Sequence, residues 1–256
     1  MQKNLYTMRS TEGNDPHWRV FGYVELSERL SDIPRTRPAE LSRLEEALMP
    51  GLFEATDRLE RIPIADAEVY YLGNLELGHR DDAILNQLIA GSPWRQENIF
   101  VWGKNHPQPR LVAWYGDRGA DYTYSGITLT PIPWTDLLLD IKRRVETVAV
   151  SGFNSVLLNY YRDNRDSMGF HSDDEPELGE RPVIASLSLG EERTFILKHK
   201  VNKLLKPIRI RLASGSLLLM KGETQRHWKH SICKESRPCG PRINLTFRRI
   251  TRKEPG

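Results

Sequence analysis

The sequence has few cysteines and no long apolar run. Cys233 and Cys239 are the only two cysteines in 256 residues, and without a CxxC pair they indicate neither a zinc site nor a disulfide-stapled secreted domain. Runs such as Leu217–Met220 are far shorter than the ~20 residues that a membrane-spanning helix needs. The N-terminus also lacks the apolar segment of a signal peptide. We therefore expect a soluble intracellular monomer, cytoplasmic in a bacterium or nuclear in a eukaryote.

The chain also lacks a strong net charge, but its charge is unevenly distributed. Residues 1–60 carry 8 basic and 11 acidic residues, whereas the remainder carries 29 basic and 23 acidic ones. An uninterrupted basic series comprises Lys198, Lys200, Lys203, Lys206, Arg209 and Arg211. Clustering of this kind is typical of a surface that binds a polyanion, although a solvated strand-loop-strand face would have the same pattern.

The first 60 residues show no pattern that indicates chemistry. Pro34, Pro38 and Pro50-Gly51 interrupt them, so we expect an N-terminal extension over residues 1–60. Residues 61–250 should form one domain, because 39% of the chain is hydrophobic and can bury a substantial core. Residues 251–256 should form a short basic tail.

Within the domain, helical patterns come first and strand patterns follow. Helices are predicted from Asp81 to about Gly91 and from Asp136 to about Val148, with a strand over Ala67–Leu72 and another over Trp94–Lys104. Later strands are predicted over Asn154–Tyr161, Val183–Leu189, Thr194–Lys198, Ile208–Leu212, Ser216–Met220 and Arg242–Ile250. This order predicts an α+β protein with a double-stranded β-helix (jelly-roll) core and the N-terminal helices packed on one sheet.

One short stretch has the residues of a metal site. His171 and Asp173 lie two residues apart, and a second histidine further along the chain would complete a 2-His-1-carboxylate triad for non-haem Fe(II). His227 and His230 are both candidates by spacing. Because the chain has seven histidines, a surface turn with an unrelated histidine would explain the pair as well.

The strand predicted near the C-terminus separates polar from apolar residues completely. Arg242, Asn244, Thr246 and Arg248 alternate with Ile243, Leu245 and Phe247. An edge strand with its polar face in water would show this pattern. If the polar face is buried instead, the two arginines need an anion, since burying unpaired charges is costly. Their Cα atoms would be ~20 Å apart, which suits the two ends of a dicarboxylate. Asn159 and Tyr161 share one face of an earlier strand and could bind the same anion.

Two aromatic residues further upstream also share one strand face. Tyr122 and Tyr124 would lie side by side in an extended segment. Such a pair can stack on nucleic-acid bases, although packing in a core is the commoner use.

Short motifs follow one another in the order of the chain: Tyr122-Thr-Tyr-Ser-Gly126, Leu158-Asn-Tyr-Tyr161, His171-Ser-Asp-Asp-Glu175, Ala185-Ser-Leu-Ser-Leu-Gly190, Lys198-His-Lys200, Gly215-Ser-Leu-Leu-Leu-Met220, His227-Trp-Lys-His-Ser231 and Arg242-Ile-Asn-Leu-Thr-Phe-Arg248. Through these motifs, the run from about Trp94 to Arg249 resembles the AlkB family of Fe(II)/2-oxoglutarate-dependent dioxygenases, which reverse alkylation damage in nucleic acids.

The resemblance implies a role for each of these residues. His171, Asp173 and His230 would hold Fe(II), and 2-oxoglutarate would be bound by Asn159, Tyr161, Arg242, Asn244, Thr246 and Arg248. Arg242 would hold the distal carboxylate and Arg248 the end near the metal. The target base would lie against Tyr122, Tyr124 and His171, with Asp174 and Glu175 at its edge. With O2, such an enzyme hydroxylates N-methyl groups of bases such as 1-methyladenine and 3-methylcytosine and releases formaldehyde.

The resemblance extends to a hairpin of the branch that acts on duplex DNA. Trp102, where that branch usually carries Phe, would wedge into the base stack, with Lys104 and Arg110 nearby. Methylated DNA is therefore the expected partner. The alternatives are an RNA demethylase, a 2-oxoglutarate oxygenase acting on protein or a small molecule, and a catalytically dead nucleic-acid-binding module.

Overall fold

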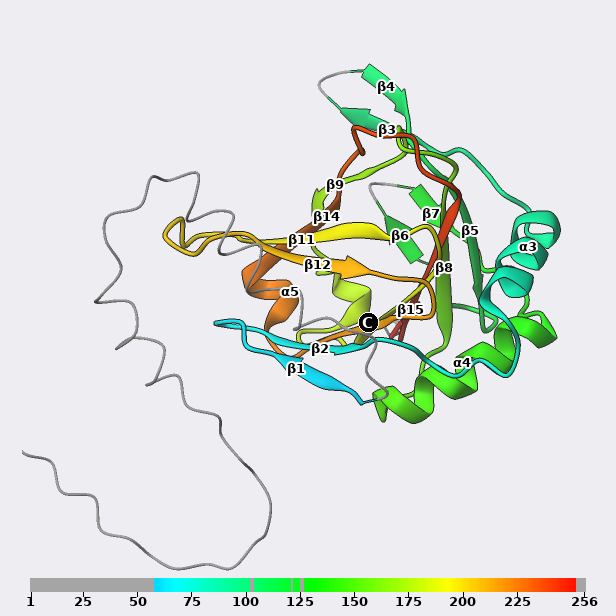
Figure 1. The fold of residues 1–256 in the computed structure, drawn as a ribbon, viewed down its shortest axis with the longest axis horizontal. Coiled ribbons are helices and arrows are strands. Elements are labelled where there is room, and N and C mark those ends of the chain that lie inside the picture. Colours follow the sequence, from blue (N-terminus) through cyan, green and yellow to red (C-terminus); the bar gives the residue numbers. More distant parts are fainter. Residues whose placement is uncertain (1–57, 102–103, 121, 125–126, 252–256) are drawn as a thin grey trace, which may run out of the picture. The chain divides into compact units, whose positions relative to one another are not determined.

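The structure is a computed structural model that describes residues 58–101, 104–120, 122–124 and 127–251 (Figure 1). The extension expected over residues 1–60 therefore lies almost entirely outside the described residues, as does most of the expected tail over residues 251–256. The first described strand begins at Glu60.

Two antiparallel sheets form the core. The larger sheet has the strand order β1-β2-β13-β10-β15-β8-β5 and the smaller one has the order β12-β11-β14-β9. The strands of the larger sheet are β1 (Glu60–Ile62), β2 (Glu68–Leu72), β13 (Leu217–Lys221), β10 (Ile184–Gly190), β15 (Arg242–Arg248), β8 (Ser155–Tyr161) and β5 (Leu111–Gly116). Those of the smaller sheet are β12 (Ile208–Leu212), β11 (Arg193–His199), β14 (Trp228–Ile232) and β9 (Met168–His171). This arrangement is the jelly-roll core that the sequence predicts.

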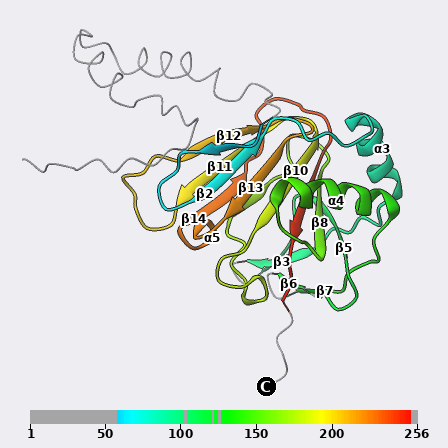
Figure 2. The ribbon, with the colours of Figure 1, turned by 90° about the horizontal axis from the view of Figure 1, so that it is seen from below.

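Two helices cover the outer face of the larger sheet. They are α3 (Asp81–Gly91) and α4 (Asp136–Ala149), and Figure 2 shows α4 lying across β8 and β10. The hydroxyl of Thr135 caps α4 by accepting a hydrogen bond from the Leu138 amide. Two short helical segments, Pro176–Leu178 (η1) and α5 (Thr224–His227), lie between strands. Within the described residues, no helix is long and apolar enough to cross a membrane.

The larger sheet is buried on both faces, and this explains the alternation along β15. Ile243, Leu245 and Phe247 belong to the apolar cluster that includes residues of both helices. The residues that alternate with them face the space between the two sheets, and even Asn244, the most exposed of them, has only 8% of its surface exposed. β15 is a central strand, so the edge-strand interpretation is wrong and the buried-arginine interpretation is confirmed.

Most predicted elements agree with the structure to within about one residue, but some do not. The strand predicted over Trp94–Lys104 is a hairpin of β3 (Asn98–Val101) and β4 (Lys104–Pro107). A second small hairpin pairs β6 (Tyr122–Tyr124) with β7 (Ile127–Leu129). Strands β1, β5, β7, β9 and β14 were not predicted. In β9 and β14, histidines and a glycine replace the apolar alternation that usually identifies a strand.

The turn between β10 and β11 depends on a glycine, and this gives a stability prediction. Gly190 has φ +89°, and a Cβ atom placed on it would lie 2.3 Å from the Pro241 carbonyl oxygen. We expect Gly190→Ala to lower the free energy of unfolding in urea by about 1–3 kcal/mol. The control is Gly91→Ala, because a Cβ atom at that position has nothing within 4 Å. Equal unfolding midpoints for the two variants would contradict the prediction.

Candidate functional site

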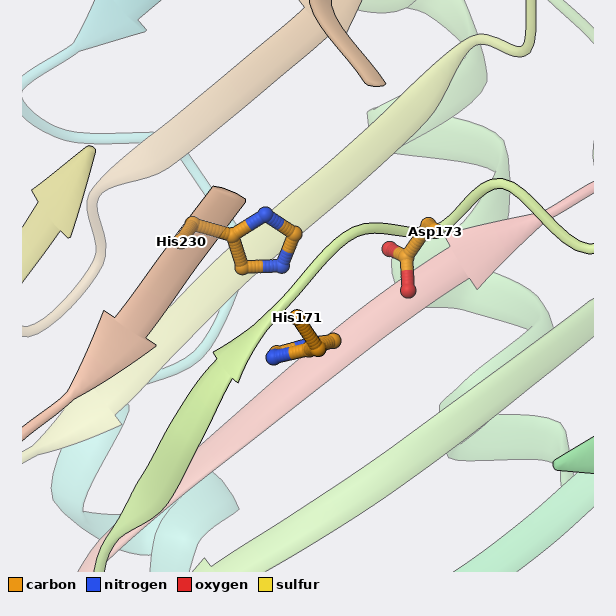
Figure 3. A group of neighbouring side chains, drawn as sticks. All are labelled: His171, Asp173 and His230. Atoms are coloured by element: carbon orange, nitrogen blue, oxygen red, sulfur yellow. The ribbon is translucent and has the colours of Figure 1, made fainter. Parts of the chain in front are cut away.

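Three side chains that can bind a metal converge between the sheets. His171 ends β9, Asp173 lies just after it, and His230 lies on β14 directly opposite His171. Their ligand atoms all lie within 4.8 Å of one another, and the ring centroids of the two histidines are 4.2 Å apart. Figure 3 shows these side chains gathered at one point. His227 lies outside this group and packs against His199, so of the two candidate histidines His230 is the one that the fold brings to His171 and Asp173.

The surroundings of the group keep its ligand atoms free of protons. Burial acts to raise the pKa of Asp173, but the charge of Arg248 and the two imidazoles outweigh it and hold this pKa at about 2. Burial and the neighbouring His171 lower the pKa of His230 to about 3. Burial also lowers the pKa of His171. At neutral pH the group is therefore a carboxylate with two neutral imidazoles, the protonation state that binds a divalent metal.

Neighbouring groups fix the segment that carries the ligands. The Asp173 amide donates to Gln225 Oε1 at 2.9 Å, and the Ser172 hydroxyl donates to the Trp228 carbonyl at 2.9 Å. Nδ1 of His171 lies 2.9 Å from the Gly169 carbonyl oxygen, which favours the tautomer that leaves Nε2 free to bind a metal. These contacts join the segment after β9 to α5 and β14.

One buried carboxylate oxygen of this group, Asp173 Oδ2, has no hydrogen-bond partner within the part of the chain that the structure describes. Buried polar atoms without a partner are rare and are often explained by a bound ion. Two imidazoles and one carboxylate are the ligands of non-haem Fe(II). The residues present therefore fit this metal.

The two arginines of β15 have different partners. Arg248 donates from Nη2 to Asp173 Oδ1 at 2.7 Å, so it forms a buried ion pair with a predicted metal ligand. Arg242 is 1% exposed and donates to the Ser188 hydroxyl, but its Nε and Nη1 lack a hydrogen-bond partner among the described residues. Burial lowers the pKa of Arg242 to about 10, which still leaves it charged at neutral pH. A buried cation in this state fits a carboxylate ligand.

One cavity connects the three metal-binding residues with these arginines. Its lining consists of Leu157, Asn159, Tyr161, Met168, His171, Asp173, Ser186, Phe195, Met220, His230, Ser231, Ile232, Arg242, Asn244, Thr246 and Arg248. Every residue predicted to hold the metal or the cosubstrate is in this lining. Strand pairing explains part of the arrangement, because Tyr161 lies opposite Arg242 and Asn159 lies opposite Asn244.

Two serines of β10 belong to the same polar wall but were given no role by sequence reasoning. Ser186 accepts a hydrogen bond from Asn244 Nδ2 at 2.7 Å, and Ser188 accepts one from Arg242 Nη2 at 3.0 Å. The available signal was their alternation within the run Ala185–Gly190, where two hydroxyls in an otherwise apolar strand indicate a polar inner face.

The residues predicted to contact the substrate are more scattered. Arg110 is only 4% exposed and donates from Nε to Asn159 Oδ1 at 2.7 Å, so its side chain is buried behind a residue of the cavity lining and is not on the protein surface. Asp174 is exposed and forms an ion pair with Lys200 at 2.7 Å, and Glu175 directly precedes η1. Trp102 lies outside the described residues. Lys104 lies in β4, and Tyr122 and Tyr124 lie in β6. The side chains of these three residues are also outside the described part of the structure.

Comparisons with known proteins agree with this site. A family model described as the 2OG-Fe(II) oxygenase superfamily matches residues 69–248. The mouse (Mus musculus) alpha-ketoglutarate-dependent dioxygenase alkB homolog 3 is 45% identical over 177 residues, which are 66% of this chain and 61% of that protein. The mouse DNA oxidative demethylase ALKBH2 is 47% identical over 158 residues, 59% of this chain and 66% of that protein. The Arabidopsis thaliana DNA oxidative demethylase ALKBH2 is 35% identical over 217 residues, 69% of this chain and 68% of that protein.

The similarity covers only part of the relatives' length, and it extends to a solved structure. The chain spans about three fifths of the length of the alkB homolog 3 relatives from mouse, rat and human. Among solved structures, that of OsALKBH1 has a TM-score of 0.51 at 16% sequence identity and covers 75% of this chain and 100% of its own. This structural similarity supports the jelly-roll fold.

The choice between the two histidines gives a test of the metal site. We expect His230→Ala to weaken Mn(II) binding, measured by isothermal titration calorimetry, by more than about a hundredfold, because one of three ligands is lost. His227→Ala is the matched control and should keep the affinity within about twofold. A larger loss in the His227 variant than in the His230 variant would refute the assignment.

Proposed function

The chain belongs to the 2OG-Fe(II) oxygenase superfamily and, within it, to the AlkB family, and from this premise we propose that it is an oxidative demethylase of nucleic-acid bases. Its substrates are N-methylated bases of the 1-methyladenine and 3-methylcytosine type in DNA. It uses Fe(II), 2-oxoglutarate and O2 and releases formaldehyde. The observation that carries the proposal is the single cavity that contains both the metal-binding group and Arg242, a buried cation that needs an anion.

Different residues bind the metal at one end of the cavity and the distal carboxylate of the cosubstrate at the other. His171, Asp173 and His230 hold Fe(II), which together with 2-oxoglutarate and O2 supplies the oxidising chemistry when bound. Arg242 pairs with the distal carboxylate of 2-oxoglutarate, and Arg248 keeps Asp173 ionised at the metal end. Asn159, Tyr161, Asn244 and Thr246 line the wall between these ends and orient the cosubstrate.

The burial of the site gives the substrate one direction of approach. His230 and Asp173 are buried, whereas His171 is partly exposed at the end of β9. The base therefore reaches the metal past His171, and the interior of the sandwich keeps water away from the cosubstrate. Asp174 and Glu175 directly follow the metal-binding segment. Their carboxylates favour a base that carries the positive charge of N1 or N3 methylation.

The choice of DNA rests on the relatives, two of which are named DNA oxidative demethylase. Flipping a base out of a duplex costs little when methylation has already broken its pairing. RNA of the same sequence is tested as the alternative substrate.

The activity test uses oligonucleotides of one sequence that contain 1-methyladenine or 3-methylcytosine. The full chain is reconstituted anaerobically with Fe(II) and 2-oxoglutarate, O2 is admitted, and demethylation is followed by mass spectrometry alongside formaldehyde release. We expect repair of DNA, with His171→Ala reducing the rate to that without enzyme and His227→Ala retaining it. Repair of RNA but not of DNA would make RNA the assigned substrate. Turnover of 2-oxoglutarate by the His171→Ala variant at the original rate would refute the assignment of the enzyme and its metal site.

The β3–β4 hairpin gives a separate test of duplex binding. Its two strands flank residues 102–103 in the sequence, and the proposed role of Trp102 is to enter the base stack. Because the wedge offsets the few kcal/mol of unstacking, we expect Trp102→Ala to slow repair of duplex DNA by about tenfold. Single-stranded repair serves as the internal control and should change little. If the variant repairs duplex DNA as fast as the original chain does, the wedge is excluded.

A further inference from the structure

A further buried arginine lies next to the cavity but outside its lining. Arg193 begins β11 in the smaller sheet, and its side chain is 0% exposed. Arginine is almost never fully buried unless its charge is compensated. The metal and cosubstrate roles proposed above do not use Arg193, so its position requires a separate explanation.

Main-chain oxygens of two segments compensate most of this charge. Arg193 donates to the carbonyls of Asp163, Asp166 and Cys233, and its Nε lies 3.5 Å from Glu235 Oε1. The first two carbonyls belong to the segment that follows β8 of the larger sheet, and Cys233 and Glu235 follow β14 of the smaller sheet. Arg193 therefore ties the two sheets together at the end of the sandwich where β8 ends.

Arg193 and Arg242 both lie over the ring of Tyr161. The Arg193 Cζ atom is 5.7 Å from the ring centroid, and the Arg242 Cζ atom is 5.2 Å from it. Tyr161 is 3% exposed, lines the cavity, and is the cross-strand neighbour of Arg242. Burial lowers the pKa of Arg242, and the positive charge of Arg193 acts in the same direction.

We propose that Arg193 is a positioning residue that closes the Arg242 end of the cavity and thereby sets the length of dicarboxylate that the cavity accepts. The inference rests on the proposed function, since it deepens the cosubstrate site. By holding the segment after β8 and packing over Tyr161, Arg193 prevents the ring from moving away from Arg242. Without it, the end of the cavity can lengthen and the distal carboxylate loses its fixed position.

The test compares ligands that differ only at the distal end. Binding of 2-oxoglutarate, of the longer 2-oxoadipate and of 2-oxobutyrate, which has no distal carboxylate, is measured calorimetrically on the Mn(II)-loaded full chain. We expect Arg193→Met to weaken 2-oxoglutarate binding by about tenfold. Affinity for 2-oxoadipate should fall by a smaller factor, so the ratio of the affinities for 2-oxoglutarate and 2-oxoadipate should become smaller. Binding of Mn(II) and of 2-oxobutyrate should stay within about twofold.

Two other variants make the result specific. Arg193→Lys keeps the charge but loses the planar fork, so it should narrow the preference in the same direction by a smaller factor, and it replaces the Met variant if that one does not fold. Arg211→Met is the matched control, since Arg211 lies on the neighbouring strand β12, is 74% exposed and pairs with Glu192. It should leave all three affinities unchanged.

The outcomes separate this inference from the proposed function. If the Arg193 variants lose the same factor of affinity for all three ligands, or lose affinity for Mn(II), Arg193 only stabilises the fold and the inference is overturned. An unchanged preference in both Arg193 variants would also overturn it. Failure of the unmodified chain to bind 2-oxoglutarate would instead refute the proposed function.

Discussion

The burial of two positive charges inside the sandwich is the constraint on which the site depends. Arg248 is compensated within the chain by Asp173, and the same ion pair keeps this carboxylate ionised and ready to bind a metal. Arg242 has a hydroxyl and an aromatic ring as neighbours but no acid within hydrogen-bonding distance among the described residues. Because an uncompensated buried charge costs several kcal/mol, a dianionic ligand stabilises the protein as well as taking part in its chemistry.

The fold makes this burial feasible by placing β15 in the centre of the larger sheet. Hydrogen bonds to β10 and β8 satisfy its main chain on both sides, and helices cover its apolar face. On the polar face, Thr246 donates to Asn244 and Asn244 donates to Ser186. The buried amide and hydroxyl are therefore satisfied within the protein, whereas Nε and Nη1 of Arg242 have no hydrogen-bond partner among the described residues.

The sequence alone predicts the parts of the site that have a local pattern. The alternation of Arg242–Arg248 and the His171–Asp173 pair are visible in short runs, and the family resemblance supplied their roles. Spacing could not choose between His227 and His230, since the choice depends on which of them lies opposite β9 in the sheet. Arg193 was given no role, and the sequence predicted Arg110 at the substrate and not in contact with Asn159. Their partners are carbonyls and an amide far away in sequence, and such contacts leave no pattern in the chain.

The pairing of His171 with His230 has a mechanical consequence. β9 is the outermost strand of the smaller sheet, and its register with β14 becomes irregular just beyond this pair. Exposed edge strands are where sheets fray and where chains aggregate, and Phe170 on β9 is 45% exposed. A metal bound by both imidazoles would join this edge strand to β14 through side chains, in addition to the main-chain pairing, and would therefore resist fraying at the open edge of the sheet.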